Sequence, residues 1–140
     1  IPAKSNMYGS PNAEHSPYRI SSKCIEKNDS SGKLIEFPLL TTRFLGKKIP
    51  AAGGFYLRSL PTKVIKNAIK NYEKECMPAT FYIHSWELTP EFMPRLDLPL
   101  KDKFVTYHNL GKAYSRMSEL LKHFEFTSFS RYITENKMMI

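Results

Sequence analysis

Ala79-Thr-Phe-Tyr-Ile-His-Ser-Trp-Glu-Leu88 is the stretch that decides the fold we expect for this chain. Its first half follows Pro78, is rich in β-branched and aromatic residues, and therefore predicts a buried strand. Its second half becomes polar abruptly at His84. Because ligands of parallel α/β sheets and barrels bind at the carboxyl ends of the strands, we expect His84, Trp86 and Glu87 to face a crevice.

The length and composition indicate one folded unit. A chain of 140 residues is long enough for one hydrophobic core and too short for two, so a single domain over residues 1–140 is expected. Its hydrophobic fraction of 41% is that of a folded protein, whereas its ten prolines indicate many loops. We expect a loop-rich lead-in over residues 1–33 and the main body of the domain over residues 34–140.

The chain is basic, with 21 Lys and Arg against 13 Asp and Glu and a formal net charge of +8. This charge by itself suits a polyanionic ligand. The basic residues are scattered and form no dense run, so the pattern favours an ordinary solvated surface. Nucleic-acid binding is a hypothesis that rests on net charge alone, and we expect no nucleic-acid partner.

Cys24 and Cys76 match no Cys-x-x-Cys or Cys/His metal pattern, and we interpret them as ordinary thiols, although the sequence leaves a disulfide open. We find no apolar run long enough to span a bilayer, and the chain starts at Ile1 without a leader. We therefore expect a soluble fragment of a longer protein; its compartment stays unknown.

Helical periodicity is clearest in two segments. Pro61–Lys74 predicts a helix with a buried face, and Asn109 is a plausible N-cap for a second one. The expected buried faces are Ile65, Ala68, Ile69 and Tyr72 in the first helix, and Leu110, Ala113, Met117, Leu120, Leu121 and Phe124 in the second.

Several shorter segments carry weaker signals. Short strands are expected at Ile20–Ile25, Leu34–Leu40 and Phe126–Phe129, and residues 101–108 are expected to be irregular or a short helix. A C-terminal helix or tail is expected at Ser130–Ile140. Between these elements, the proline-rich residues 89–100 predict an extended loop.

The pair Gly53-Gly54 precedes two aromatic residues. Adjacent glycines permit a positive φ or a close approach of the backbone to a ligand. A simple bend of the chain explains them equally well. The spacing is not that of a phosphate-binding loop, so it does not indicate a nucleotide site.

An ordered series of motifs resembles a known family over nearly the whole chain. The series consists of Leu34-Ile-Glu-Phe-Pro38, Arg43-Phe-Leu-Gly46, Gly53-Gly-Phe-Tyr-Leu-Arg58, Phe81-Tyr-Ile-His-Ser-Trp-Glu87, Tyr107-His-Asn-Leu110 and Phe124-Glu-Phe-Thr-Ser-Phe129. It resembles the C-terminal portion of NodB-type polysaccharide deacetylases, in the subset that carries an extra C-terminal domain and is often found in bacterial exopolysaccharide gene clusters. The resemblance implies an α/β fold that is the C-terminal part of a distorted (β/α) barrel.

The resemblance also implies metal-dependent hydrolysis of N-acetyl groups on a polysaccharide. In such enzymes an Asp and two His hold a divalent metal such as zinc, and a second Asp acts as base. This chain has neither Thr-Phe-Asp-Asp nor His-x-x-x-His, so no metal-binding residue is expected in it. We expect an N-terminal deacetylase half as its partner and no activity from the chain alone.

The last family motif, Leu-x-His at the end of a strand, corresponds to Tyr82-Ile83-His84, with Tyr82 in place of Leu. The resemblance implies that His84 is the general acid that protonates the leaving amine. A structural histidine is the alternative interpretation.

Other residues are expected to contact the substrate. Trp86 would stack on a sugar, and Glu87 would orient His84 or bind a hydroxyl. The remaining expected contacts are Tyr82, Glu36, Arg43, Gly53, Gly54 and Arg58. For the charged and aromatic members of this set, packing or salt bridging is an equally good explanation.

Two further hypotheses stay open. The chain is alternatively a non-catalytic module that binds polysaccharide through its charge and exposed aromatic residues. If its strands are half of a barrel, they leave an apolar edge that another chain would cover, so a homo-oligomer is also possible.

Overall fold

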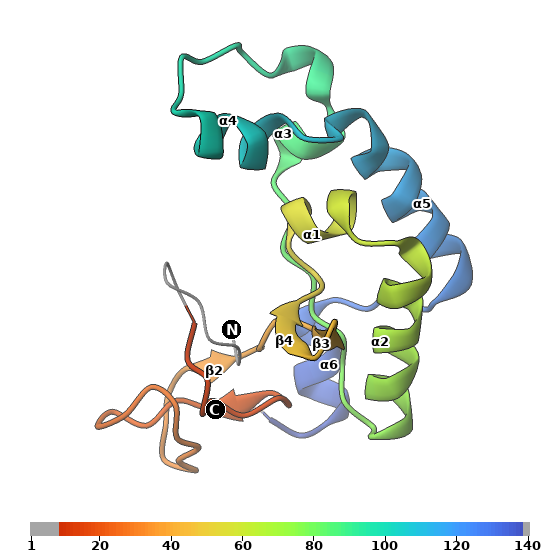
Figure 1. Ribbon diagram of the computed structural model, residues 1–140. Helices are drawn as coiled ribbons and strands as arrows, with labels where there is room; N and C mark the ends of the chain where they lie inside the picture. The colour runs from red at the N-terminus through yellow and green to blue at the C-terminus, as the bar shows by residue number, and fades with distance from the viewer. Residues whose placement is uncertain (1–8, 139–140) are drawn as a thin grey trace.

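The structure, a computed structural model, describes residues 9–138 and combines short strands with helices in a mixed α/β arrangement (Figure 1). The strands are β1 (Tyr18–Arg19), β2 (Ile35–Glu36), β3 (Thr41–Phe44) and β4 (Lys47–Pro50). The helices are α1 (Gly54–Ser59), α2 (Thr62–Lys74), α3 (Ser85–Leu88), α4 (Leu100–Tyr107), α5 (Ala113–His123) and α6 (Phe129–Glu135), with 3-10 turns η1 (Pro90–Phe92) and η2 (Leu110–Lys112).

Helix α2 confirms the clearest prediction from the sequence. Its buried residues are Ile65, Ala68, Ile69 and Tyr72, as its periodicity indicates. They join a core with buried residues of the β3–β4 region, of α1 and of α5, which are Leu40, Ala51, Ala52, Leu57, Leu60 and Leu120. On the surface, an ion pair of 2.7 Å between Lys66 and Glu119 links α2 to α5.

Three chain segments meet next to this core and position the site. Strands β3 and β4 form an antiparallel hairpin whose turn is Leu45-Gly46, both with positive φ. At its base, isolated parallel bridges join Leu39 to Thr80 and Gly53 to Tyr82. Tyr82, at the carboxyl end of the bridged segment Thr80–Tyr82, therefore lies beside Gly53 and the start of α1.

The strands are shorter than the sequence predicted. Only β1 and an isolated bridge at Ile20 form near the predicted strand Ile20–Ile25, and within Leu34–Leu40 only β2 forms. The strand predicted for the first half of residues 79–88 is reduced to isolated bridges at Thr80 and Tyr82, and the polar second half enters α3. The strand predicted at Phe126–Phe129 was also wrong, because Ser128 caps the N-terminus of α6 through a bond from the Arg131 N–H.

The second predicted helix is present as η2 followed by α5. Leu110, Ala113 and Leu120 are buried, but Leu121 is 53% exposed, which corrects the predicted face. Asn109 occupies the predicted N-cap position, in front of η2, but its φ is 52° and its side chain makes no capping bond. Residues 1–8 of the predicted lead-in and residues 139–140 of the predicted C-terminal segment lie outside the described residues. Among residues 9–138, every helix is too short or too polar to span a bilayer.

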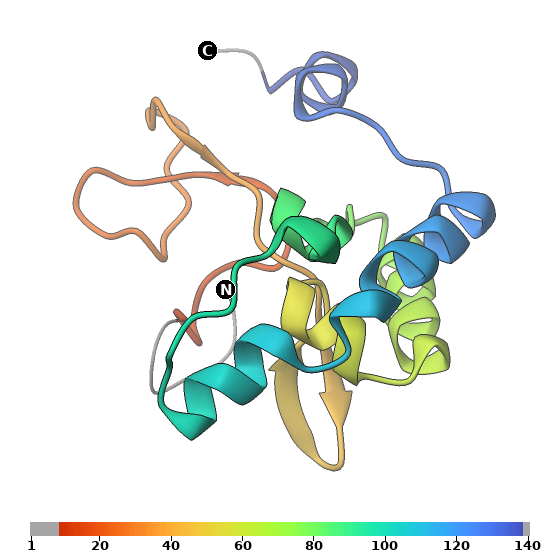
Figure 2. The ribbon, with the colours of Figure 1, turned by 90° about the horizontal axis from the view of Figure 1, so that it is seen from above.

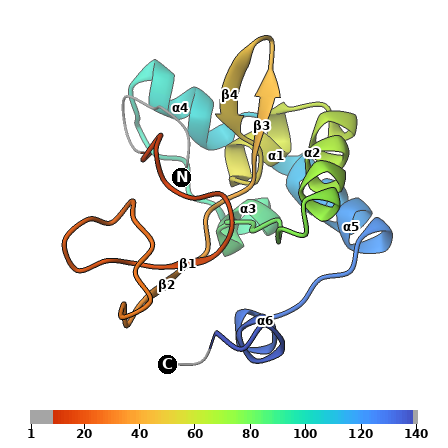
Figure 3. The same ribbon diagram turned by 90° about the horizontal axis from the view of Figure 1, so that it is seen from below.

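The two small sheets, β1–β2 and β3–β4, lie in different parts of the molecule (Figure 3). The β3–β4 hairpin lies beside α1 and α2, whereas β1 and β2 lie beside α6. Helix α6 stands apart from the other helices (Figure 2) and packs its Phe129 ring on Phe37 with 4.5 Å between ring centroids. Arg19 Nη2 also donates to the Met138 carbonyl at 2.9 Å, so β1 is bonded to the segment that follows α6.

His15 anchors the lead-in to the core through a chain of hydrogen bonds. Lys48 Nζ donates to His15 Nε2 at 2.6 Å, so His15 Nδ1 carries the hydrogen that it shares with the Tyr72 hydroxyl at 3.1 Å. The same hydroxyl accepts from the Thr41 N–H at 3.2 Å. Burial and then the Lys48 charge lower the pKa of His15, and Glu75 and Glu14 partly oppose them. The anchor thus requires a neutral imidazole.

We predict that this anchor weakens in acid. Because the folded-state pKa of His15 lies below the ordinary 6.5, the unfolded chain takes up the proton at a higher pH than the folded chain does. The stabilisation is therefore fully present above pH 6.5 and is lost as the pH falls from there through the lowered pKa. Urea unfolding at about pH 7.5 and about pH 5.5 measures the loss, and a His15→Gln variant is expected to show a smaller difference between the two.

The matched control is His123→Gln, which makes the same change at an exposed position on α5. It is expected to keep the wild-type difference between the two pH values. If wild type and His15→Gln have the same free energy of unfolding at both pH values, the anchor is contradicted.

Candidate functional site

A pocket of about 610 Å³ opens where the bridged segments meet α1, α3 and the end of α4. It is lined by Leu39, Pro50, Gly53, Gly54, Phe55, Tyr56, Arg58, Tyr82, His84, Trp86, Glu87, Val105 and Thr106. Seven of the nine residues that the sequence singled out thus lie around one pocket. The site residues remain a prediction, but the structure brings most of them together.

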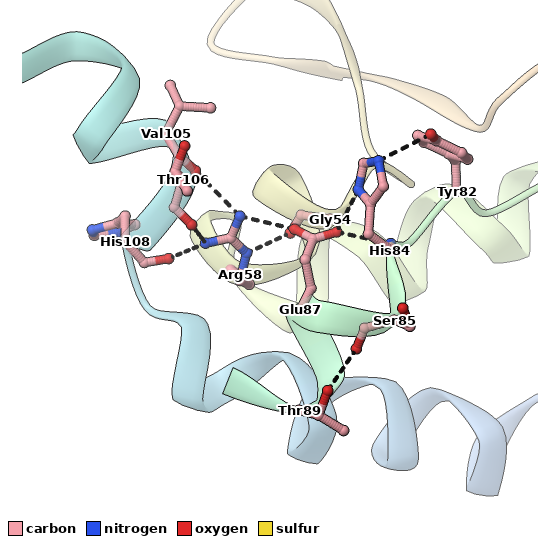
Figure 4. A network of polar contacts seen from close by, with 10 residues as sticks. All are labelled: Gly54, Arg58, Tyr82, His84, Ser85, Glu87, Thr89, Val105, Thr106 and His108. Atoms are coloured by element: carbon pink, nitrogen blue, oxygen red, sulfur yellow. Dashed lines mark hydrogen bonds and ion pairs between the residues drawn. The ribbon is translucent and has the colours of Figure 1, made fainter. Parts of the chain in front are cut away.

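Arg58 and Glu87, which both line the pocket, form a buried ion pair (Figure 4). Arg58 Nη2 lies 2.8 Å from Glu87 Oε1, and the two side chains are only 1% and 2% exposed. Moving two charges out of water costs several kcal/mol for each ion, so such a pair persists only when its other polar atoms are bonded too. Both residues line the pocket, but their burial and pairing favour the salt-bridging interpretation of Arg58 over a direct contact with substrate.

The remaining donors of Arg58 are bonded to backbone carbonyls (Figure 4). Its Nε donates to Gly54 O at 3.2 Å, and its Nη1 donates to Thr106 O at 3.2 Å and to His108 O at 2.6 Å. Its Nη2 also reaches Val105 O at 3.2 Å. The last carbonyls of a helix lack hydrogen-bond donors within the helix. At the end of α4, the Arg58 guanidinium supplies these donors. Arg58 thus fixes α4 against α1.

The second oxygen of Glu87 holds His84. Glu87 Oε2 accepts from the His84 N–H at 3.1 Å and lies 3.3 Å from His84 Nδ1. His84 is the N-cap of α3 and Glu87 its third residue, so the carboxylate satisfies an otherwise unpaired donor at the helix start. Of the two roles that the sequence offered for Glu87, the geometry matches orienting His84.

Aromatic rings surround the His84 imidazole on two further sides. The Trp86 ring stacks on it with 5.3 Å between centroids and an interplanar angle of 21°. The Tyr82 ring meets it edge-on, and the Tyr82 hydroxyl lies 3.0 Å from His84 Nε2. The His84 side chain is nevertheless 45% exposed, so it remains open to the pocket and to solvent.

Gly54 allows the buried carboxylate to approach the backbone. A Cβ built on Gly54 would overlap both carboxylate oxygens of Glu87. Neither Gly53 nor Gly54 has a positive φ. A close approach thus occurs at Gly54 only, and the approaching group is the protein's own Glu87; the approach of a ligand stays a prediction, and α1 begins here instead of a loop.

Glu36 and Arg43 are not brought to this pocket. Glu36 pairs with Tyr18 across β1 and β2. Arg43 lies opposite Lys48 in the β3–β4 hairpin and lines a separate pocket of about 470 Å³ with His15 and Tyr72. Pairing of β2 with β1 and of β3 with β4 holds these two expected substrate contacts in small sheets outside the pocket.

The sequence analysis missed the apolar part of the pocket. The missed lining residues are Leu39, Pro50, Phe55, Tyr56, Val105 and Thr106. Phe55 and Tyr56 directly follow the glycine pair, which was the one available signal for them. Val105 and Thr106 come from α4, a segment that carried no strong signal.

Metal-binding groups are not gathered in this part of the protein. Within residues 9–138, no group of three or more His, Cys, Asp or Glu side chains is placed to hold a metal ion. The residues present therefore do not fit the metal that the family resemblance implies. Cys24 and Cys76 are free thiols, as we interpreted them.

Comparison with family models matches residues 1–134 to a family described as a domain of unknown function, DUF3473. The chain belongs to this family. The DUF3473 domain is known as the C-terminal region of polysaccharide deacetylases, which confirms the resemblance at that level. Neither the curated proteins nor the solved structures contain a significant match to the chain.

The tight fit of Gly54 against Glu87 yields a prediction for this DUF3473 domain. In Gly54→Ala, the added methyl group displaces the Glu87 carboxylate and strains the ion pair with Arg58. We expect the free energy of unfolding to fall by about 1–3 kcal/mol. Thermal or urea unfolding measures this loss, and the fluorescence of the single tryptophan, Trp86, is expected to change because its stacking partner His84 is released.

Gly53→Ala is the matched control. A Cβ on Gly53 would make an ordinary contact of 3.7 Å with Tyr56, and the φ of −85° suits alanine. Its stability is expected to stay within about 1 kcal/mol of wild type. Equal losses in the two variants would contradict the close approach at Gly54.

Proposed function

We propose that this chain is the C-terminal part of a NodB-type carbohydrate N-deacetylase and supplies the general acid, His84, to the active site. The substrate class is an N-acetylated polysaccharide, as in the exopolysaccharide-associated subset of the family. The observation that carries the proposal is the placement of His84, which a buried carboxylate holds at the mouth of a pocket in a domain of deacetylase type.

The side chains around His84 suit proton transfer. Glu87 fixes the ring through Nδ1, so Nε2 is the nitrogen left to exchange a proton at the pocket. A histidine is suited to protonating a leaving amine because its ordinary pKa is near neutrality. Trp86 and Tyr82 present apolar ring surface beside Nε2, where the face of a sugar would pack.

The metal and the catalytic base would come from another segment of the complete protein, because the residues described here do not supply them. We therefore assign this chain three tasks only: to bind sugar, to orient His84 and to hold its proton. The chain alone is expected to release no acetate.

We also propose that the bridged strands are part of a distorted (β/α) barrel. The Thr80 carbonyl accepts from the Leu40 N–H at 3.1 Å, and the Tyr82 N–H donates to the Ala52 carbonyl at 2.9 Å. Alternate residues of a strand direct their backbone groups to the same side, so these bonds occupy one edge. The intervening Phe81 faces the other edge and has no backbone hydrogen bond within residues 9–138. A free edge of this kind supports continuation of the sheet into a further segment.

The apolar surroundings of that edge support the same proposal. A groove of about 560 Å³ runs along it and is lined by Phe81, Ile83, Met117, Phe124 and Phe126, among others. A strand of the N-terminal half would bond to Phe81 and fill this groove.

Amide hydrogen exchange tests the barrel. In the isolated chain, the Phe81 amide is expected to exchange fast and the Tyr82 amide slowly, because only the second is bonded. In the complete protein both amides are expected to be protected. Fast exchange of Phe81 in the complete protein would show that no strand covers this edge.

Mutation of His84 tests the activity. In the full-length protein acting on an N-acetylated amino-sugar oligomer, His84→Ala is expected to lower kcat for acetate release by roughly 10²–10⁴-fold, the usual contribution of a general acid. The matched control, His123→Ala, removes an exposed imidazole of α5 outside the pocket and is expected to leave kcat unchanged. Unchanged acetate release in His84→Ala would remove the acid role.

A polysaccharide-binding module without catalysis is the second candidate. The exposed Tyr82 ring and the Trp86 ring, which both contact His84 and line the pocket, favour it, because aromatic residues bind sugars whether or not a reaction follows. Under this alternative the isolated chain binds the oligomer, and the full-length protein releases no acetate. If the isolated chain binds the oligomer more weakly as the salt concentration rises, part of the affinity comes from the net charge of +8.

A further inference from the structure

The hydroxyl of Tyr82 is hydrogen-bonded to the imidazole of His84, and both residues line the pocket (Figure 4). It is 3.0 Å from His84 Nε2, the ring nitrogen that faces away from Glu87. Tyr82 is 56% exposed and lines the pocket, so its hydroxyl is accessible to a bound ligand. His84 and Tyr82 are two residues apart on the same extended segment, which puts both side chains on one side of it.

The other contacts of the ring decide which nitrogen carries the hydrogen. Glu87 Oε2 lies 3.3 Å from His84 Nδ1, and Glu87 is paired with Arg58 through its other oxygen. A carboxylate only accepts, so Nδ1 must carry the hydrogen of a neutral imidazole. Nε2 then accepts from the Tyr82 hydroxyl. In the protonated imidazole, Nε2 donates to the same hydroxyl oxygen.

The His84 side chain is 45% exposed, but its Nε2 is already engaged by the Tyr82 hydroxyl. The Trp86 ring covers one face, Glu87 occupies the Nδ1 edge and the Tyr82 ring stands across the Nε2 edge with a centroid distance of 4.8 Å. A substrate that leaves this hydrogen bond in place therefore exchanges a proton with His84 through the Tyr82 hydroxyl.

From this geometry we propose that Tyr82 is a catalytic residue that relays the proton between His84 and the substrate. The inference rests on the proposed deacetylase function. As the C–N bond breaks, its electron pair goes to nitrogen and forms an N–H bond with the Tyr82 hydroxyl proton. The proton on His84 Nε2 moves at the same time to the Tyr82 oxygen. The phenol is regenerated, and the imidazolium becomes a neutral imidazole with its hydrogen on Nδ1.

The test compares three variants of the full-length protein on an N-acetylated amino-sugar oligomer. Tyr82→Phe keeps the ring and removes the hydroxyl, and it is expected to lower kcat for acetate release at least about 10-fold with KM changed less than about twofold. The double variant His84→Ala with Tyr82→Phe is expected to be no slower than His84→Ala alone, because the two residues act in one relay. Tyr114→Phe is the control: it removes the hydroxyl of an exposed tyrosine on α5 that does not line the pocket, and it is expected to leave kcat unchanged.

A proton inventory in mixtures of H2O and D2O separates the relay from a structural role. In wild type, two protons move in one step, so a plot of kcat against the deuterium fraction of the solvent is expected to be curved. In Tyr82→Phe the dependence is expected to become linear. A linear wild-type inventory would overturn the relay even if Tyr82→Phe is slow.

The outcomes also separate this inference from the function on which it rests. If His84→Ala removes activity and Tyr82→Phe keeps the wild-type kcat, the relay is wrong and His84 acts directly. If Tyr82→Phe raises only KM, Tyr82 is a substrate contact and not a relay. If His84→Ala keeps full activity, the proposed function itself fails.

Discussion

The buried ion pair of Arg58 and Glu87 is the constraint on which the rest of this structure depends. Both charges have left water, and each is compensated by further polar contacts: four backbone carbonyls for Arg58, and the N–H and Nδ1 of His84 for Glu87. Loss of one partner from such a pair typically costs about 3–5 kcal/mol because the other charge stays buried. Helices α1, α3 and the end of α4 are therefore held in a single arrangement.

That arrangement produces the candidate site. Because Glu87 cannot move, the ring it bonds has a fixed orientation and a fixed hydrogen position, and the ring edge that remains is turned toward Tyr82. The requirement for a glycine at position 54 follows from the same constraint, since the carboxylate lies against the backbone of α1. The buried polar network and the aromatic rings around His84 thus form one unit.

Long polar side chains replace much of the backbone pairing that a larger sheet would supply. The described strands contain at most four residues, so ladders satisfy few of the backbone donors and acceptors. Arg116 Nη1 instead binds the carbonyls of Leu57 and Leu60 at 2.7 and 2.8 Å, and the Tyr72 hydroxyl serves the Thr41 N–H. Arg116 is one of the basic residues that the sequence suggested to be solvated surface, but its side chain has a structural role here.

Local pattern predicted some elements well and others poorly. Helix α2 was predicted nearly to the residue, because its apolar spacing and Pro61 specify a helix and its buried face independently of the partner. The strand boundaries were wrong, because a strand is defined by its partner, and short apolar runs such as Phe126–Phe129 find none here.

The sequence by itself indicated a resemblance to the C-terminal region of polysaccharide deacetylases, the helix α2 and the clustering of polar and aromatic residues at His84-Ser-Trp-Glu87. Only the tertiary structure decided that Arg58 and Glu87, 29 positions apart, are buried together, that Gly54 makes room for them, and that Glu36 and Arg43 lie elsewhere. The physical reason is that periodicity and turn chemistry act over a few residues. Whether a charge is solvated or paired depends instead on which distant segments exclude water around it.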